Sequence, residues 1–148
     1  MNFKTKRDRF FVVIWISLVL LINLSFLVPF LLTEFHSNEF MIIMFLNIIT
    51  TGLLIWLAVD IKYVLYEDYL YVKGGPFRSK IKYQDIFKIT GDPNIWVGYR
   101  ILFAKDAIEV HYKTGFGSVI ISPENKQIFI EELLKKNNSI KVSKILAK

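Results

Sequence analysis

Two apolar stretches without a charged residue dominate the first 59 residues of the chain. They run over 10–32 and 40–59, and neither contains Asp, Glu, Lys, Arg or His. As helices with a rise of about 1.5 Å per residue, they extend roughly 34 and 30 Å, which matches a bilayer hydrocarbon core of about 30 Å. The pattern predicts two transmembrane helices, which a short external connector at 33–39 joins into an antiparallel hairpin.

The charges beside the two stretches predict their orientation. Residues 1–9 carry a net charge of +3, the connector carries −2, and the chain from residue 60 onward carries +5. Lys and Arg next to a span remain on the cytoplasmic side. We therefore expect a multi-pass protein of the cell membrane with both termini cytoplasmic. Its parts are a basic N-terminus at 1–9, the hairpin at 10–59 and a cytoplasmic domain at 60–148.

A cleaved signal peptide is the alternative interpretation of the first stretch. The stretch at 10–32 is longer than the usual apolar region of such peptides, about 7 to 15 residues, and no A-x-A-like cleavage site follows it. The membrane span is therefore the preferred interpretation.

Asn23 and Asn47 are expected to lie at similar depth in the hairpin. Asn23 precedes the end of the first stretch by nine residues, and Asn47 follows the start of the second by seven. A carboxamide in hydrocarbon needs a hydrogen-bonding partner, and such interhelical contacts contribute about 0.6 to 2 kcal/mol. The sequence predicts an Asn23–Asn47 contact that holds the two helices together, with helix packing favoured over a transport role.

After residue 59 the sequence changes to short alternating segments separated by turn residues, the pattern of an antiparallel sheet. The predicted strands are 62–66, 69–73, 79–83, 85–89, 100–104, 107–113 and 117–121. A helix is predicted to follow, with Ser122 as N-cap, Pro123 at the first helical position and Glu124 in the first turn. Its apolar stripe comprises Phe129, Ile130, Leu133 and Leu134.

The order of seven strands and one C-terminal helix is that of a pleckstrin-homology (PH) fold. The stretches YLYVKGGPFRSKIKYQDIFKI, GDP, DAIEVHY and VIISPENKQIFIEELLKKN closely resemble the bacterial PH-like domain of the YyaB-like family. These are small membrane proteins, mostly of undefined function. The resemblance implies an α+β membrane protein: a two-helix transmembrane hairpin followed by a seven-stranded antiparallel β-barrel or sandwich capped by one C-terminal helix.

Catalytic chemistry has little support in the sequence. The chain has no cysteine, and its two histidines, His36 and His111, lie far apart. No P-loop, GxGxxG, HExxH or GxSxG motif occurs. We therefore expect a protein that is not an enzyme, with no metal site, no cofactor and no nucleic-acid partner.

Basic residues form the most suggestive functional pattern. Arg78, Lys80 and Lys82 alternate along one predicted strand, and Lys73 lies just across the preceding turn. This stripe is loosely similar to the basic residues with which some PH domains hold a lipid head group. Trp96 lies in a loop, a position from which aromatic residues often contact a membrane or a partner. These five residues are the candidate contacts. A plain solvated face is the alternative for the basic residues, and packing onto its own domain is the alternative for Trp96.

The leading hypothesis is a non-enzymatic, membrane-anchored PH-like module. Because two residues separate the second apolar stretch from the first strand, the domain must lie against the bilayer. It would contact either anionic lipid head groups or another membrane protein. A protein that protects against a bacteriocin and an accessory subunit of a membrane transporter are the alternatives.

Overall fold

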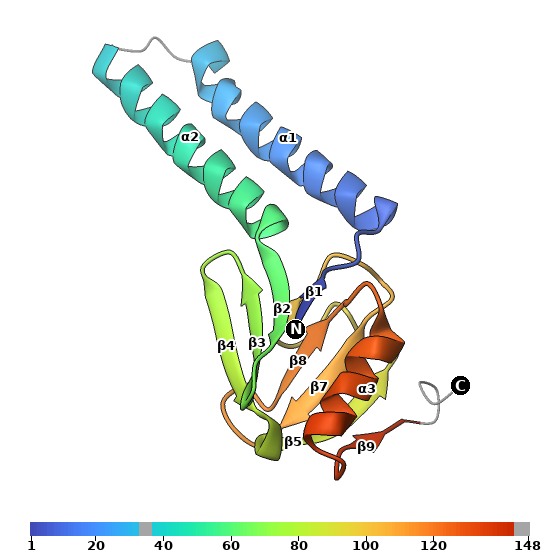
Figure 1. Cartoon of the computed structure of the whole chain (residues 1–148). Helices are drawn as coiled ribbons and strands as arrows, with labels where there is room; N and C mark the ends of the chain where they lie inside the picture. The colour runs from blue at the N-terminus through green and yellow to red at the C-terminus, as the bar shows by residue number, and fades with distance from the viewer. Residues whose placement is uncertain (33–36, 144–148) are drawn as a thin grey trace.

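The computed structural model describes residues 1–32 and 37–143 of the chain, and in it two long helices project from one end of a two-sheet domain (Figure 1). Helix α1 spans Arg9–Leu32 and helix α2 spans Ser37–Val59. The start of α2 lies three residues before the predicted one, and positions 33–36 of the predicted connector lie outside the described residues. The two helices run side by side as an antiparallel hairpin.

The first sheet contains four antiparallel strands in the order β1-β2-β3-β4. Their bounds are β1 Asn2–Lys4, β2 Ile61–Leu65, β3 Tyr69–Gly74 and β4 Phe77–Lys82. The second sheet has the order β6-β8-β7-β5-β9. Its bounds are β5 Ile86–Gly91, β6 Arg100–Ile101, β7 Ile108–Tyr112, β8 Ser118–Ile121 and β9 Lys141–Val142. All seven predicted strands are present, and the short β1 and β9 are additions.

The strands form two separate sheets, so the expectation of a closed barrel is wrong. A 3-10 turn, η1 at Tyr83–Asp85, carries the chain from β4 in the first sheet to β5 in the second. It occupies the junction where the sequence has no Gly or Pro. The expectation of a purely antiparallel arrangement also needs correction, because β6 pairs with β8 and β9 pairs with β5 in parallel.

Helix α3 spans Lys126–Lys136 and begins later than predicted. Ser122 is fully buried, and its hydroxyl accepts a hydrogen bond from the Phe103 N–H at 3.1 Å. Pro123 forms a β-bridge with Thr5. These residues therefore continue the edge of the sheet, which leaves them unavailable as a helix cap. The expected apolar stripe is present, since Phe129, Ile130 and Leu133 are buried.

The segment before α1 belongs to the domain that follows α2. Strand β1 pairs with β2, and the side chain of Phe3 packs edge-on against Phe129 of α3 with ring centroids 5.1 Å apart. Backbone hydrogen bonds from Lys6 N–H to the Ser122 carbonyl and from Glu124 N–H to the Lys4 carbonyl join the segment to the end of β8. The N-terminal segment thus contributes a strand to the first sheet, and the hairpin is inserted between two paired strands.

Candidate functional site

Four cations form one row across the first sheet, at the end where α2 enters it. The strand register places Lys4 opposite Lys62, Lys62 opposite Lys73, and Lys73 opposite Arg78. We call these four residues the basic row. Their side chains lie on the outer face of the sheet, because the alternate face is buried in the core. Like charges directly opposite each other destabilise a sheet, so this row gains stability from neighbouring anions.

Lys73 is the member of the basic row that already has an acidic partner. Its ammonium lies 2.6 Å from the carboxylate of Asp60, which also accepts a hydrogen bond from the Trp56 indole at 3.0 Å. The hydrogen bond from Lys73 is the main reason that the pKa of Asp60 lies below its usual range. Burial opposes this shift, and Trp56 and the charge of Lys62 support it. The ion pair thus links Lys73 on β3 to Asp60 at the junction of α2 and β2.

The predicted stripe runs along β4, away from the helices. Arg78, Lys80 and Lys82 are all exposed, and none forms an ion pair within residues 1–32 and 37–143. With a rise of about 3.4 Å per residue in an antiparallel strand, Lys80 lies about 7 Å and Lys82 about 14 Å farther from the helices than Arg78. The Lys80 ammonium lies 5.7 Å from the ring centroid of Tyr69. Arg78 is therefore the stripe residue nearest to the helices.

Trp96 lies beside the first turns of α1, in the loop between β5 and β6. Its ring stacks on Phe11 with centroids 6.4 Å apart, yet 59% of the residue is exposed. Phe77, the first residue of β4, is 56% exposed, and both residues line one shallow depression. The helix-proximal end of the domain thus carries an apolar edge as well as the basic row.

An apolar cavity of about 310 Å³ lies between the helices and this edge. Phe11 and Trp15 of α1, Leu57 of α2, and Phe77 and Trp96 of the domain contribute to its wall. Among the described residues that line it, Arg100 is the one that carries a charge. The cavity is thus an almost entirely apolar surface at the level where the helices meet the domain.

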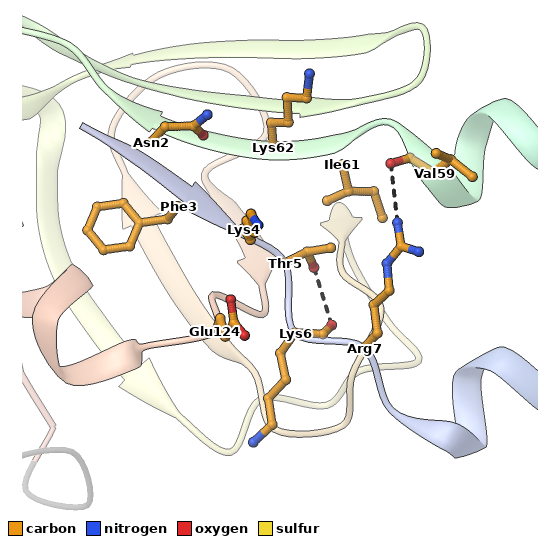
Figure 2. Close-up of a pocket in the computed structure, with 10 residues that line it drawn as sticks. All are labelled: Asn2, Phe3, Lys4, Thr5, Lys6, Arg7, Val59, Ile61, Lys62 and Glu124. Carbon is orange, nitrogen blue, oxygen red and sulfur yellow. Dashed lines mark hydrogen bonds between the residues drawn. The ribbon is translucent and has the colours of Figure 1, made fainter.

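A basic cleft of about 640 Å³ opens between the N-terminal segment, the end of α2 and the start of β2 (Figure 2). Its cations are Lys4, Lys6, Arg7 and Lys62, and its one acid among the described lining residues is Glu124. The ammonium of Lys6 is bound by the Asp106 carboxylate at 2.7 Å. The cleft and the basic row share Lys4 and Lys62, so the two features form one positively charged region.

Asn23 forms its hydrogen bond across the hairpin with Thr51, whereas the sequence predicts Asn47 as the partner. Asn23 donates to the Thr51 hydroxyl at 3.0 Å and to the Val19 carbonyl at 2.8 Å. Thr51 lies one turn closer to the domain than Asn47, so the side-chain hydrogen bond of Asn23 across the hairpin runs to Thr51. Asn47 is half-buried on the face of α2 that also carries Thr51.

The described residues contain no cluster of three or more His, Asp and Glu side chains that could hold a metal ion. His111 lies on β7, where its Nε2 atom is 3.0 Å from the Thr90 hydroxyl and 3.6 Å from the Glu109 carboxylate. The Thr90 contact connects β7 to the neighbouring β5, whereas Glu109 lies on β7 itself.

Sequence reasoning missed Lys4, Arg7, Lys62 and Phe77 as parts of the site. Lys4 joins the basic row only because a three-residue strand precedes α1 and pairs with β2. The alternation of outward Asn2 and Lys4 with inward Phe3 is the pattern that could have indicated this strand. Its shortness makes the pattern weak, since strands usually have 3–10 residues with a mode near five or six.

Residues 61–137, just over half of the chain, match the model of a bacterial PH domain family. The uncharacterised protein YyaB of Bacillus subtilis (strain 168) is 35% identical over 140 residues, which cover 95% of each chain. No solved structure matches the chain. The family match begins at β2, so β1 lies outside it. The chain belongs to the bacterial PH domain family, and its similarity to YyaB extends over nearly its whole length.

Proposed function

We propose that this protein is a non-catalytic, membrane-anchored PH-like module that rests its helix-proximal end on the anionic cytoplasmic leaflet. The observation that carries the proposal is the basic row across the end of the first sheet where α2 enters. Trp96 and Phe77 supply apolar contacts beside it. Lys62 and Arg78 supply the electrostatic contacts.

The helices support the membrane part of the proposal by their surface. Both are long and apolar enough to cross a bilayer, and no residue in their most apolar windows is buried in the protein. A helix that is apolar on all sides needs an apolar surrounding, which is either a protein core or a membrane. The domain does not supply that core, because it contacts only the base of the hairpin.

Distance from the membrane decides which cations contribute most. Lys62 follows the last residue of α2 by three positions, or about 10 Å of extended chain. The head-group region extends roughly 5–8 Å beyond the hydrocarbon core, and charges are screened over about 8 Å at physiological ionic strength. The long side chains of Lys62 and Arg78 therefore reach the lipid phosphates. Lys82, about 14 Å farther away, lies beyond the screening length.

A fluorophore at position 77 tests this docking in the full chain. The chain has no cysteine, so Phe77→Cys provides a single attachment site for an environment-sensitive dye. We expect blue-shifted emission in nanodiscs of mixed phosphatidylglycerol and phosphatidylcholine, relative to phosphatidylcholine alone, and a loss of the shift at high salt. Removing Lys62 or Arg78 should lower the docked-to-undocked ratio about fivefold, because each cation contributes about 1 kcal/mol.

Three controls define the result. Lys82→Gln should have a smaller effect than Arg78→Gln, and Lys113→Gln, on the turn after β7, should have none. The same dye at Glu67→Cys, in the turn at the opposite end of the first sheet, should emit alike in both nanodiscs. Equal emission from position 77 in neutral and anionic nanodiscs would contradict lipid docking and favour a protein partner for the apolar edge.

A further inference from the structure

Three cations that line the basic cleft have no acidic partner. Within the described parts of the chain, Lys4, Arg7 and Lys62 form no ion pair. The acid nearest to Lys62 in sequence, Asp60, is bound to Lys73 at 2.6 Å. The cleft therefore retains an excess of positive charge that the protein itself does not neutralise.

The strand register fixes two of these cations opposite each other. Lys4 and Lys62 are direct partners of the antiparallel β1–β2 pair, and both line the cleft. Cβ atoms of such partners lie about 4.5–5.5 Å apart, where like charges destabilise the sheet. An anion that accepts hydrogen bonds from both ammonium groups would convert this repulsion into attraction.

Arg7 contributes a third set of donors from the base of α1. One guanidinium nitrogen, Nη2, donates to the carbonyl of Val59 at 3.4 Å, which holds the side chain beside the last residue of α2 (Figure 2). A guanidinium has five N–H donors, so most of them remain available. Its planar geometry suits two oxygens of one phosphate.

We propose that the basic cleft binds the phosphate head group of one anionic lipid, held by Lys4, Arg7 and Lys62. This inference rests on the proposed function, because the bilayer supplies the lipid. The basic cleft has a volume of about 640 Å³, which lies within the usual range for sites of small molecules, about 300–1,000 Å³. The position at the cytoplasmic ends of both helices places the phosphate at the depth of the lipid head groups. The site is a discrete one, in contrast to the diffuse attraction of the exposed face.

Thermal unfolding of the full chain in neutral detergent micelles tests the site without a charged membrane surface. Short-chain phosphatidylglycerol should raise the unfolding temperature in a saturable manner, because a ligand that binds only the folded state stabilises it. Short-chain phosphatidylcholine should not. The variant Lys4→Gln/Lys62→Gln should lose the response, and Lys4→Arg/Lys62→Arg should keep it. Arg7→Gln should weaken it.

The controls separate this site from general charge effects and from surface docking. Lys113→Gln/Lys136→Gln removes two cations elsewhere and should respond like the unmodified chain. Arg78→Gln, outside the cleft, should also respond normally even though it weakens docking on anionic nanodiscs. Loss of the response in Arg78→Gln, an unchanged response in Lys4→Gln/Lys62→Gln, or no response of the unmodified chain would overturn the proposal. Equal stabilisation by inorganic phosphate would overturn the lipid assignment.

Discussion

The buried hydroxyl of Tyr63 connects three segments of the domain. It donates to the Ile101 carbonyl at 2.6 Å, accepts from the Ser122 N–H at 3.2 Å, and lies 3.1 Å from the Thr5 hydroxyl. Burial raises the pKa of this phenol, so the group remains neutral. One side chain thereby joins β2 to β6, to the end of β8 and to the segment before α1.

Tyr63→Phe should lower the free energy of unfolding by about 1–3 kcal/mol, because it leaves buried backbone groups of Ile101 and Ser122 without their partner. Urea unfolding of the full chain in neutral detergent, followed by circular dichroism, measures this loss. Tyr66→Phe is the matched control, since Tyr66 is 47% exposed, and it should change stability by no more than about 0.5 kcal/mol. Equal effects of both substitutions would show that the Tyr63 hydroxyl is dispensable.

Ser122 and Pro123 show why single residues can mislead. The pair has the composition of a helix start, yet the N-terminal segment competes for the same groups. The Ser122 carbonyl accepts the Lys6 N–H, and its hydroxyl serves Phe103. These partners come from distant parts of the sequence, so local pattern alone could not have placed the helix start at Lys126.

Strand β1 is short, yet it contributes both to the core and to the candidate site. It has three residues, yet its central Phe3 is 8% exposed and packs against α3. The strand also brings Lys4 to the basic row and to the cleft. Stability and the candidate site therefore depend on the same short element.

Phe3→Ala should destabilise the domain by about 3 kcal/mol, as expected for loss of a buried aromatic side chain. The same unfolding measurement checks the value, with Asn2→Ala as the control on the exposed face of the strand. If the two substitutions had equal effects, β1 would be detached from the core in solution. A domain that starts at residue 60 lacks Phe3 and Thr5 altogether, and we expect it to fold poorly.

The seven longer or better-bounded strands were predictable because period-two alternation and turn residues are local properties of the sequence. Strands β1 and β9 were not, because neither belongs to a longer segment with a distinguishable period. The two-residue β6 could be found because it begins the longer segment 100–104 that was predicted as a strand. Arg78, Lys80 and Lys82 could be placed on one face from their spacing alone. That Arg78 lies in line with Lys4 across four strands follows only from the register.

The whole molecule constrains how the hairpin can cross a membrane. The strands that flank the hairpin are hydrogen-bonded partners, so both of its ends must lie on the same side. This constraint is independent of the charge asymmetry between the connector and the flanks. It agrees with that asymmetry in placing both ends on one side, and only the charges assign that side to the cytoplasm.

Single cysteines introduced into the cysteine-free chain test this topology. A membrane-impermeant maleimide should label Asn38→Cys, at the start of α2, in intact cells. It should label Asn2→Cys and Asn138→Cys only after the cells are permeabilised. Labelling of positions 2 and 138 from opposite sides would be incompatible with β1–β2 pairing, and labelling of both from outside would reverse the proposed orientation.

The pairing of β1 with β2 also imposes an order on synthesis and folding. The segment before α1 is made first, yet its backbone partners at Ile61–Leu65 follow only after the whole hairpin. Until then the hydrophobic side chain of Phe3 has no core to enter. A hairpin inserted with only one helix across the bilayer would leave the two strands on opposite faces, with the domain unfinished and exposed to proteolysis. In the proposed topology, completion of the domain therefore requires that both ends of the hairpin lie on the same side of the membrane.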